Sequence, residues 1–187
     1  MIHLVRPDAA RHRAWAECLA EIGDGPADGS GFVSGDVPTG LDDFRSYVEN
    51  RALMEDPDEP MAAGLVHCSF RWIVDDEWPG GGPLLGFLAV RHALTRPLWD
   101  AHGHVGYSVR PSARGRGIAG EALRAGLAEA TDLGTDPVLV TCHRDNDASR
   151  RVLEKAGGRL ENVIDDHLRF WFGDGAPPPR PAEGATV

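Results

Sequence analysis

A glycine-rich stretch follows a short apolar strand and has the composition of an anion-binding turn. The strand is expected over residues 105–109, and a few residues later the chain reads Arg114-Gly115-Arg116-Gly117-Ile118-Ala119-Gly120, where a helical pattern begins. Glycines between a strand and a helix let backbone N–H groups converge on an anion, and the helix dipole adds positive potential. The sequence therefore predicts a phosphate cradle, with local positive charge from Arg110, Arg114 and Arg116.

The same letters partly satisfy two other nucleotide motifs. Gly115, Gly117 and Gly120 fit the dinucleotide pattern G-x-G-x-x-G, which is a weak signal by itself. That fold needs an acidic residue at the end of the next strand, whereas Asp136 precedes the strand expected over residues 138–142. A P-loop needs Gly-Lys-Ser/Thr after the glycines, and the sequence lacks it. A nucleotide-dependent oxidoreductase is thus kept only as an alternative.

Several side chains near the cradle are candidates for proton transfer or metal binding. His102 and His104 precede or open the strand, and an imidazole with a pKa of about 6.5 relays protons near neutral pH. A His-x-His pair could bind a metal, but no third ligand is nearby in sequence, so we expect no metal site. Cys142 would need a base and a double-displacement mechanism to act as a nucleophile, and a buried thiol is favoured instead.

Two segments together resemble the GNAT superfamily of N-acetyltransferases. Arg114-x-x-Gly117-x-Ala119 resembles its Q/R-x-x-G-x-G/A signature, whose backbone amides hold the pyrophosphate of acetyl-coenzyme A (acetyl-CoA). After the next strand, the run from Asn146-x-x-Ser149 to Ala156-Gly157 is similar to the second coenzyme-binding helix of that superfamily. The resemblance covers roughly residues 84–172. Within the superfamily, residues 103–112 (GHVGYSVRPS) are similar to a branch of predicted bacterial acetyltransferases.

The resemblance implies a fold, a co-substrate and a reaction. The fold is α/β (α+β, mixed sheet), a central and mostly antiparallel sheet with one parallel, splayed strand pair, flanked by helices. The reaction is direct transfer of the acetyl group of acetyl-CoA to a primary amine of a small molecule or peptide. The residues implied to hold the coenzyme are Val109, Arg114, Gly115, Arg116, Gly117, Ile118, Ala119, Asn146 and Ser149.

The expected catalytic residues depart from the family pattern. Relatives often place a carboxylate or histidine on the strand before the cradle as the base, and here we expect His104. Many carry a tyrosine seven residues after the asparagine of the second helix as the acid that protonates the thiolate, but that position is Leu153. We expect Tyr107 or solvent to supply this proton. Leu153 also leaves open a non-catalytic acyl-CoA sensor.

Length and composition predict one globular domain. The chain has 187 residues, of which 42% are hydrophobic and 26% charged, and we expect a domain over residues 1–173 and a disordered tail over 174–187. The net charge of −10 disfavours nucleic acid and membrane partners. Without a signal peptide or a run of ~20 apolar residues, the sequence predicts a cytoplasmic protein and leaves a homodimer open. Three separated cysteines indicate no disulfide framework.

The periodicity predicts the elements that position these residues. Helices are expected over 8–22 and 41–55, after the glycines and after Asn146, and strands over 1–6, 66–74, 84–91, 105–109, 138–142, 159–164 and 167–172. A long loop over residues 23–40 carries Asp24, Asp28 and Asp36 and no Lys or Arg. In proteins of this resemblance that region flanks the amine-binding cleft, so we expect a cationic amine acceptor.

Overall fold

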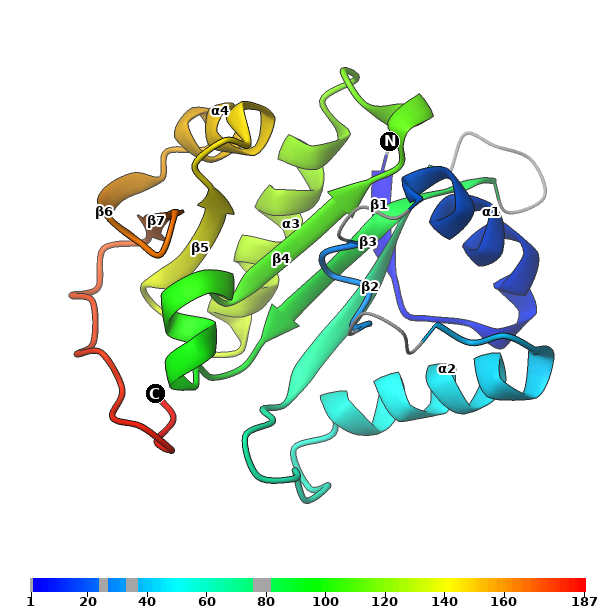
Figure 1. Ribbon diagram of the computed structural model, residues 1–187, viewed down its shortest axis with the longest axis horizontal. Coiled ribbons are helices and arrows are strands. Elements are labelled where there is room, and N and C mark those ends of the chain that lie inside the picture. The colour runs from blue at the N-terminus through cyan, green and yellow to red at the C-terminus, as the bar shows by residue number, and fades with distance from the viewer. Residues whose placement is uncertain (1, 24–26, 33–36, 76–81) are drawn as a thin grey trace.

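The computed structural model describes residues 2–23, 27–32, 37–75 and 82–187. These ranges form two antiparallel sheets flanked by helices (Figure 1), one with the strand order β1-β2-β3-β4 and the other with the order β5-β7-β6. The strands are β1 (Ile2–Val5), β2 (Cys68–Asp75), β3 (Leu84–Arg91), β4 (Val105–Val109), β5 (Val138–His143), β6 (Arg159–Ile164) and β7 (His167–Phe172).

The helices follow the predicted order along the chain. They are α1 (His12–Ile22), α2 (Leu41–Glu55), α3 (Ile118–Asp132) and α4 (Asp147–Lys155), with short helical turns η1 (Ala9–Arg11), η2 (Leu98–His102) and η3 (Pro111–Ala113). Asp8 is the N-cap of η1, because its carboxylate accepts a hydrogen bond from the Ala10 N–H at 2.9 Å. In the described part of the chain, no helix has the length and apolar character needed to cross a membrane.

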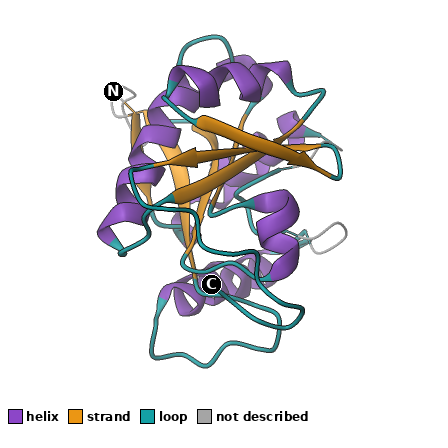
Figure 2. Ribbon diagram, turned by 90° about the vertical axis from the view of Figure 1, so that its left-hand side faces the viewer, coloured by secondary structure: helices purple, strands orange, loops and turns teal. Residues whose placement is uncertain are grey.

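Each face of the four-stranded sheet has its own core, since neighbouring residues of a strand point to opposite faces. Trp72 and Phe87 pack on the face covered by α1 and α2, together with Trp15 and Phe44, whose rings lie 4.7 Å apart. Ile73, Leu85 and Leu88 pack on the other face against α3. Figure 2 shows helices on both sides of this sheet. The mixed α/β architecture expected from the sequence is confirmed.

The strands β4 and β5 separate after a single point of contact. Their arrows point the same way in Figure 1, but their only described pairing is an isolated bridge of antiparallel type between Gly103 and Val140, beside a hydrogen bond from the His104 N–H to the Leu139 carbonyl at 2.7 Å. The expected splay is therefore present. No parallel ladder accompanies it, because all strand pairs described are antiparallel.

The C-terminal segment follows a defined path where the sequence predicts a disordered tail. Val187 and Leu94 exchange two backbone hydrogen bonds, of 2.6 and 2.9 Å. Arg180 donates two hydrogen bonds to the carboxylate of Asp100, at 2.7 and 2.6 Å. Composition alone could not reveal this packing, because the partners lie 80 or more residues earlier in the chain.

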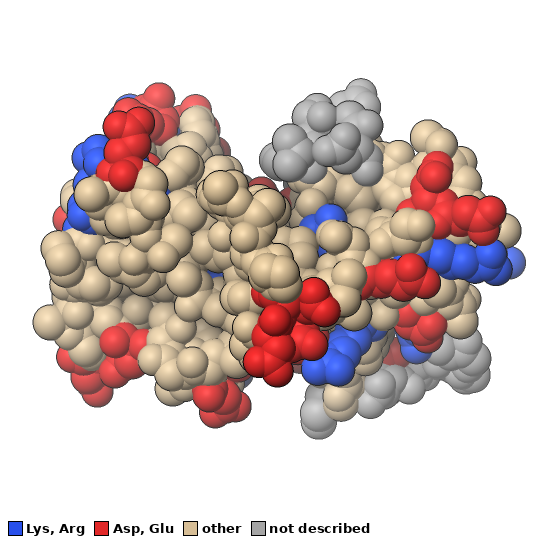
Figure 3. All heavy atoms as spheres, turned by 90° about the horizontal axis from the view of Figure 1, so that it is seen from below, with Lys and Arg blue, Asp and Glu red and all other residues tan. Residues whose placement is uncertain are grey.

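Charge is spread unevenly over the surface. On the face seen from below in Figure 3, Asp and Glu side chains form several separate groups, and Lys or Arg side chains stand beside some of them. An anionic ligand is therefore not attracted by the protein as a whole, whose formal charge is −10. Binding of such a ligand requires hydrogen-bond donors at the site itself.

Candidate active site

The glycine-rich stretch forms an open turn ahead of α3. Gly115 and Gly117 have φ values of 75° and 83°, a left-handed conformation that glycine adopts at little cost, and Gly117 is the N-cap of the helix. A Cβ atom added at either glycine would meet no atom within 4 Å. No acceptor among the described residues takes a hydrogen bond from the backbone N–H groups of residues 115–119. These donors are therefore available to an anion.

The arginines around the cradle have separate roles. Arg114 donates from Nε to the Val109 carbonyl at 2.9 Å, which fixes the turn to the end of β4. Arg116 lies 3.9 Å from Asp75, and 59% of its side chain is exposed. The guanidinium of Arg116 is thus largely open to solvent.

Arg110 belongs to the support of the turn. Its guanidinium contacts the carboxylate of Glu21 on α1 and donates to the Leu84 carbonyl at 3.2 Å. The Ser112 N–H also donates to Glu21. Hydrogen bonds from Ser112 and Arg110 lower the pKa of Glu21 to about 2. Arg110, which we expected to supply charge to a bound phosphate, has a carboxylate of the protein as its partner in this structure.

Alternate residues of β4 present their backbone groups to the splay. The Arg91 N–H donates to the His104 carbonyl at 2.8 Å, and the Arg110 N–H donates to the Leu85 carbonyl at 2.9 Å. In an antiparallel pair the residues between such positions direct their N–H and C=O groups away from the partner strand. Tyr107 and Val109 therefore turn these groups from β3 toward the gap beside β5.

The side chain of Tyr107 joins β4 to the first turn of α4. Its hydroxyl lies 3.0 Å from the hydroxyl of Ser149. Asn146 caps this helix through a hydrogen bond that its Oδ1 accepts from the Ser149 N–H at 3.0 Å. Burial raises the pKa of Tyr107 to about 12, so the phenol keeps its proton at neutral pH.

Two other residues near α4 can be assigned: Leu153 has no proton to give, and Cys142 is not a reactive nucleophile. Leu153 is fully buried and packs in the core beneath the helix. Burial raises the pKa of Cys142 on β5, so this residue is a thiol rather than a thiolate. The Tyr107 phenol is a protonated acid beside the first turn of α4. The sequence alone does not show that Tyr107 lies next to Ser149.

His104 is buried and engaged by the backbone of β5. Its side chain is 5% exposed, and Nδ1 accepts a hydrogen bond from the Leu139 N–H at 2.9 Å. Burial, followed by the charge of Arg91, lowers its pKa to about 4. The ring is therefore neutral at pH 7 with its proton on Nε2, and neither nitrogen has a lone pair left to accept another proton. This geometry suits the positioning of β4 against β5 better than the expected role of a base.

His102 is the other histidine of the His-x-His pair that could bind a metal. His102 is exposed, and burial of part of its ring and the charge of Arg91 lower its pKa. The ring of His104 is committed to Leu139. Within the described ranges, no group of three His, Cys, Asp or Glu side chains is placed to hold a metal ion.

Part of the loop between α1 and α2 packs across β3 and β4. A Cβ atom at Gly29 would lie 2.7 Å from both the Gly106 carbonyl oxygen and the Leu88 Cα. The Tyr47 hydroxyl on α2 donates to the Ser30 carbonyl at 2.9 Å and fastens the segment. Asp28 is exposed beside it. Asp24 and Asp36, the other two acidic residues expected to face the acceptor, lie outside the described residues.

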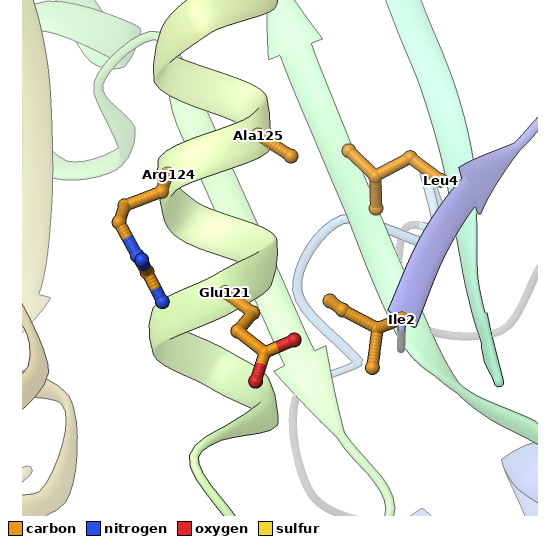
Figure 4. A pocket seen from close by; sticks show the side chains of 5 residues that line it. All are labelled: Ile2, Leu4, Glu121, Arg124 and Ala125. Carbon is orange, nitrogen blue, oxygen red and sulfur yellow. The ribbon is translucent and has the colours of Figure 1, made fainter.

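An open hollow of about 420 Å³ lies elsewhere, between β1 and α3 (Figure 4). Ile2 and Leu4 extend from β1 toward the helix, where Ala125 faces them and Glu121 and Arg124 stand beside them. This lining contains no nucleophile and no acid–base pair. We therefore place the chemistry at the splay, where the cradle, Tyr107 and Ser149 meet.

The fold and the cradle define a coenzyme-binding acyltransferase, and sequence comparison gives its family. Residues 27–159 match the family model described as an acetyltransferase (GNAT) domain. The chain therefore belongs to the GNAT family of acetyltransferases, as the two motifs indicate, and it is an enzyme of that class. Acetyl-CoA is the acetyl donor that this family uses. No curated protein matches the chain in a sequence search.

Solved structures share the fold at low sequence identity. RimJ from Mycobacterium smegmatis in complex with CoA-disulfide is 21% identical, with a TM-score of 0.63 over 91% of this chain and 81% of that one. The microcin self-immunity acetyltransferase MccE in complex with acetyl-CoA and AMP is 14% identical, with a TM-score of 0.63 over 92% of each chain. Mutant forms of the spermidine/spermine N-acetyltransferase SpeG from Vibrio cholerae are 12% identical, with a TM-score of 0.58 over 92% and 94%.

Proposed function

We propose that this enzyme transfers the acetyl group of acetyl-CoA directly to a primary amine of a small molecule or peptide. The observation that carries the proposal is the set of backbone N–H groups at residues 115–119, which have no acceptor within the described structure and which open at the N-terminus of α3. Such donors suit the pyrophosphate of the coenzyme. The open space at Gly115 and Gly117 leaves room for its approach.

The other predicted coenzyme contacts follow from this placement. Ile118 and Ala119 contribute N–H groups of the first helical turn, and Arg116 contributes an exposed guanidinium. Arg114 acts indirectly, by fastening the turn to Val109. Asn146 and Ser149 face the same gap from α4, where the cap by Asn146 leaves its amide nitrogen as a donor for the pantetheine arm. We assign all of these to coenzyme binding.

The coenzyme supplies a thioester, whose carbonyl oxygen gains negative charge when an amine attacks. The N–H groups that Tyr107 and Val109 direct into the splay are suited to stabilise that charge, as backbone donors do in other acyl transfers. The Tyr107 phenol is suited to donate a proton to the departing sulfur, because its pKa of about 12 keeps it protonated. Ser149 orients the phenol and can return a proton to it.

The proton of the acceptor amine needs another route. His104 is held as a hydrogen-bond acceptor for Leu139, so we propose that it positions β4 and that the amine proton leaves through solvent or exposed groups beside Asp28. Asp28 also favours an ammonium group near β4. An acceptor of this kind has a precedent in SpeG, a spermidine/spermine acetyltransferase of the same fold.

Thiol release measured with a panel of amines tests this function. The panel contains polyamines, amino acids, aminoglycosides and lysine peptides, and mass spectrometry identifies the acetylated product. The proposal expects release of coenzyme A that depends on at least one amine. Binding of acetyl-CoA with no transfer to any amine would instead support the non-catalytic sensor that Leu153 leaves open.

A further inference from the structure

Arg91, at the end of β3, is a guanidinium without a carboxylate partner in the described structure. Its Nη1 donates to the Gly103 carbonyl at 3.0 Å and to the His102 carbonyl at 3.4 Å, and no carboxylate oxygen of the described residues lies within 4.0 Å. Burial lowers its pKa, which reflects the cost of holding this charge away from water. A cation in this situation favours an anionic partner.

Two other arginines with little exposure are paired with carboxylates. Arg71 contacts Glu55 and Glu129, and Arg169 contacts Glu161 at 3.2 Å. Arg51 also lacks a carboxylate partner among the described residues, but its guanidinium lies over the rings of Tyr47 and Phe70, at 5.0 and 4.6 Å from their centroids. In the described structure Arg91 has neither a carboxylate nor an aromatic ring beside its guanidinium.

Arg91 lies beside the strand that carries the reaction. A Cβ atom at Gly106 would be 3.4 Å from Nη1 and 3.5 Å from Nη2 of Arg91, and 3.7 Å from the Gly29 nitrogen. Gly106 immediately precedes Tyr107 on β4 and lacks a side chain, so the guanidinium lies directly against the backbone there. Arg91 and Ala89 share the face of the sheet that α2 covers, opposite the face of Leu88 and α3.

The acidic residue Asp28 also lies beside β4, near Arg91. Asp28 precedes Gly29, which is pressed against Gly106 and Leu88, and the fastening of Ser30 by Tyr47 fixes the path of this segment. The charge of Asp28 acts on Arg91, His102 and Tyr107. No ion pair joins Asp28 to Arg91 in the described structure. A positive and a negative group are therefore held near each other beside β4, each with capacity for a ligand.

We propose that Arg91 binds a carboxylate of the acceptor while Asp28 attracts its ammonium group, so that the acceptor is a zwitterionic amine such as an amino acid or a short acidic peptide. This inference rests on the proposed acetyl transfer and narrows its acceptor class. A guanidinium offers a carboxylate two parallel N–H donors, and Arg91 has Nε and Nη2 without a described partner. A site with an unpaired charge discriminates against a ligand that leaves it unpaired.

The test compares acceptors that differ only in the carboxylate. Each pair consists of an amino acid and its amide, or a dipeptide with a glutamate and the same dipeptide with a glutamine, and kcat/KM is measured for both members. We expect the acid to be preferred by ~10- to 100-fold, the range of a hydrogen-bonded charge. Arg91→Gln should remove this preference. Asp28→Asn should lower kcat/KM for both members of a pair to a similar extent.

Two controls keep the test decisive. Arg91→Lys retains a positive charge and a donor for the carbonyl groups of residues 102–103, but it loses the two parallel N–H donors of the guanidinium. This variant should therefore retain part of the preference for the acid over the amide. Affinity for acetyl-CoA and the unfolding temperature report whether either variant disturbs the fold. If no acceptor is turned over, calorimetric titration of acid and amide into the protein saturated with coenzyme A replaces the kinetics.

The outcomes distinguish the role of Arg91 in acceptor binding from the proposed acetyl transfer. Equal kcat/KM, or equal affinity, for acid and amide in the wild-type protein overturns the role of Arg91 while leaving acetyl transfer in place. A preference that survives in Arg91→Gln assigns the carboxylate to another residue and also overturns it. Failure of the wild-type protein to bind acetyl-CoA would instead contradict the proposed function.

Discussion

The hydroxyl groups of Tyr107 and Ser149 lie 3.0 Å apart and link β4 to α4 across the gap where β4 and β5 separate. Tyr107 lies opposite Leu88 at a position of the β3–β4 pair that makes no hydrogen bonds between the strands, so its backbone N–H points into that gap. One residue thus offers both a backbone donor and a protonated phenol to the same space. In the mechanism that we propose, this combination replaces the acid that many relatives carry at the position of Leu153.

Removing the phenol hydroxyl should slow the chemical step. We expect Tyr107→Phe to lower kcat by ~10²-fold or more, the usual contribution of general acid catalysis, with little change in the KM for acetyl-CoA. Ser149→Ala keeps the phenol and removes its partner, so its effect on kcat should be smaller. Steady-state kinetics decides the point, and a Tyr107→Phe enzyme with wild-type kcat would assign the proton to solvent.

His104 should make the protein less stable in mild acid. Its pKa is lowered from 6.5 to about 4, so between these values the unfolded chain binds a proton that the folded chain does not. The free energy of unfolding should fall as the pH drops from 6.5 to 4, by roughly 3 kcal/mol from this residue, and should be unaffected by it above 6.5. Urea denaturation across this range measures the effect.

The variant His104→Gln separates positioning from catalysis. Glutamine retains an acceptor for the Leu139 N–H but does not titrate, so the acid sensitivity should shrink while kcat near pH 7 is largely retained. A fall in kcat of ~10²-fold, together with loss of the acidic limb of the pH–rate profile, would restore His104 as the base expected from the sequence.

The sequence predicted the local features of the site better than the distant ones. The left-handed turns at Gly115 and Gly117 and the cap by Asn146 depend on neighbouring residues, and composition indicates them directly. The partner of His104 lies 35 residues away and that of Arg110 lies 89 residues away. Spacing along the chain carries no signal for such pairs, so the sequence could not predict these partners.

The edges of the fold illustrate the same limit. The last residues have the glycine and proline content of a disordered tail. Nevertheless, Val187 pairs with Leu94, and Arg180 contacts Asp100 in η2. Likewise, the strand order along the chain indicates that β4 and β5 are neighbours, but it does not reveal that their pairing is limited to the bridge between Gly103 and Val140. In both cases the outcome depends on which segments meet in space, and periodicity reports only which residues are buried.

Glu21 should support the cradle from the opposite side of β4. Its pKa is lowered from 4.5 to about 2, so the stabilisation is present above pH 4.5 and is lost as the pH falls toward 2. Glu21→Gln should therefore destabilise the protein at pH 7, and the difference from wild type should narrow at pH 3. Glu17→Gln is the control, because Glu17 pairs with Arg13 on the exposed side of the same helix. Equal effects of the two substitutions on stability and on acetyl-CoA affinity would remove Glu21 from the support of the turn.

The cradle is tested most directly by calorimetric titration of acetyl-CoA into two matched glycine variants. Gly117 and Gly134 stand at opposite ends of α3 with φ values of 83° and 89°, and a Cβ atom at either would meet no atom within 4 Å. Valine should therefore strain the backbone similarly at both positions, by roughly 1–2 kcal/mol. We predict that Gly117→Val weakens acetyl-CoA binding by ~10-fold or more while Gly134→Val binds as the wild type does. Wild-type affinity in a folded Gly117→Val protein would contradict the assignment of this turn as the coenzyme cradle.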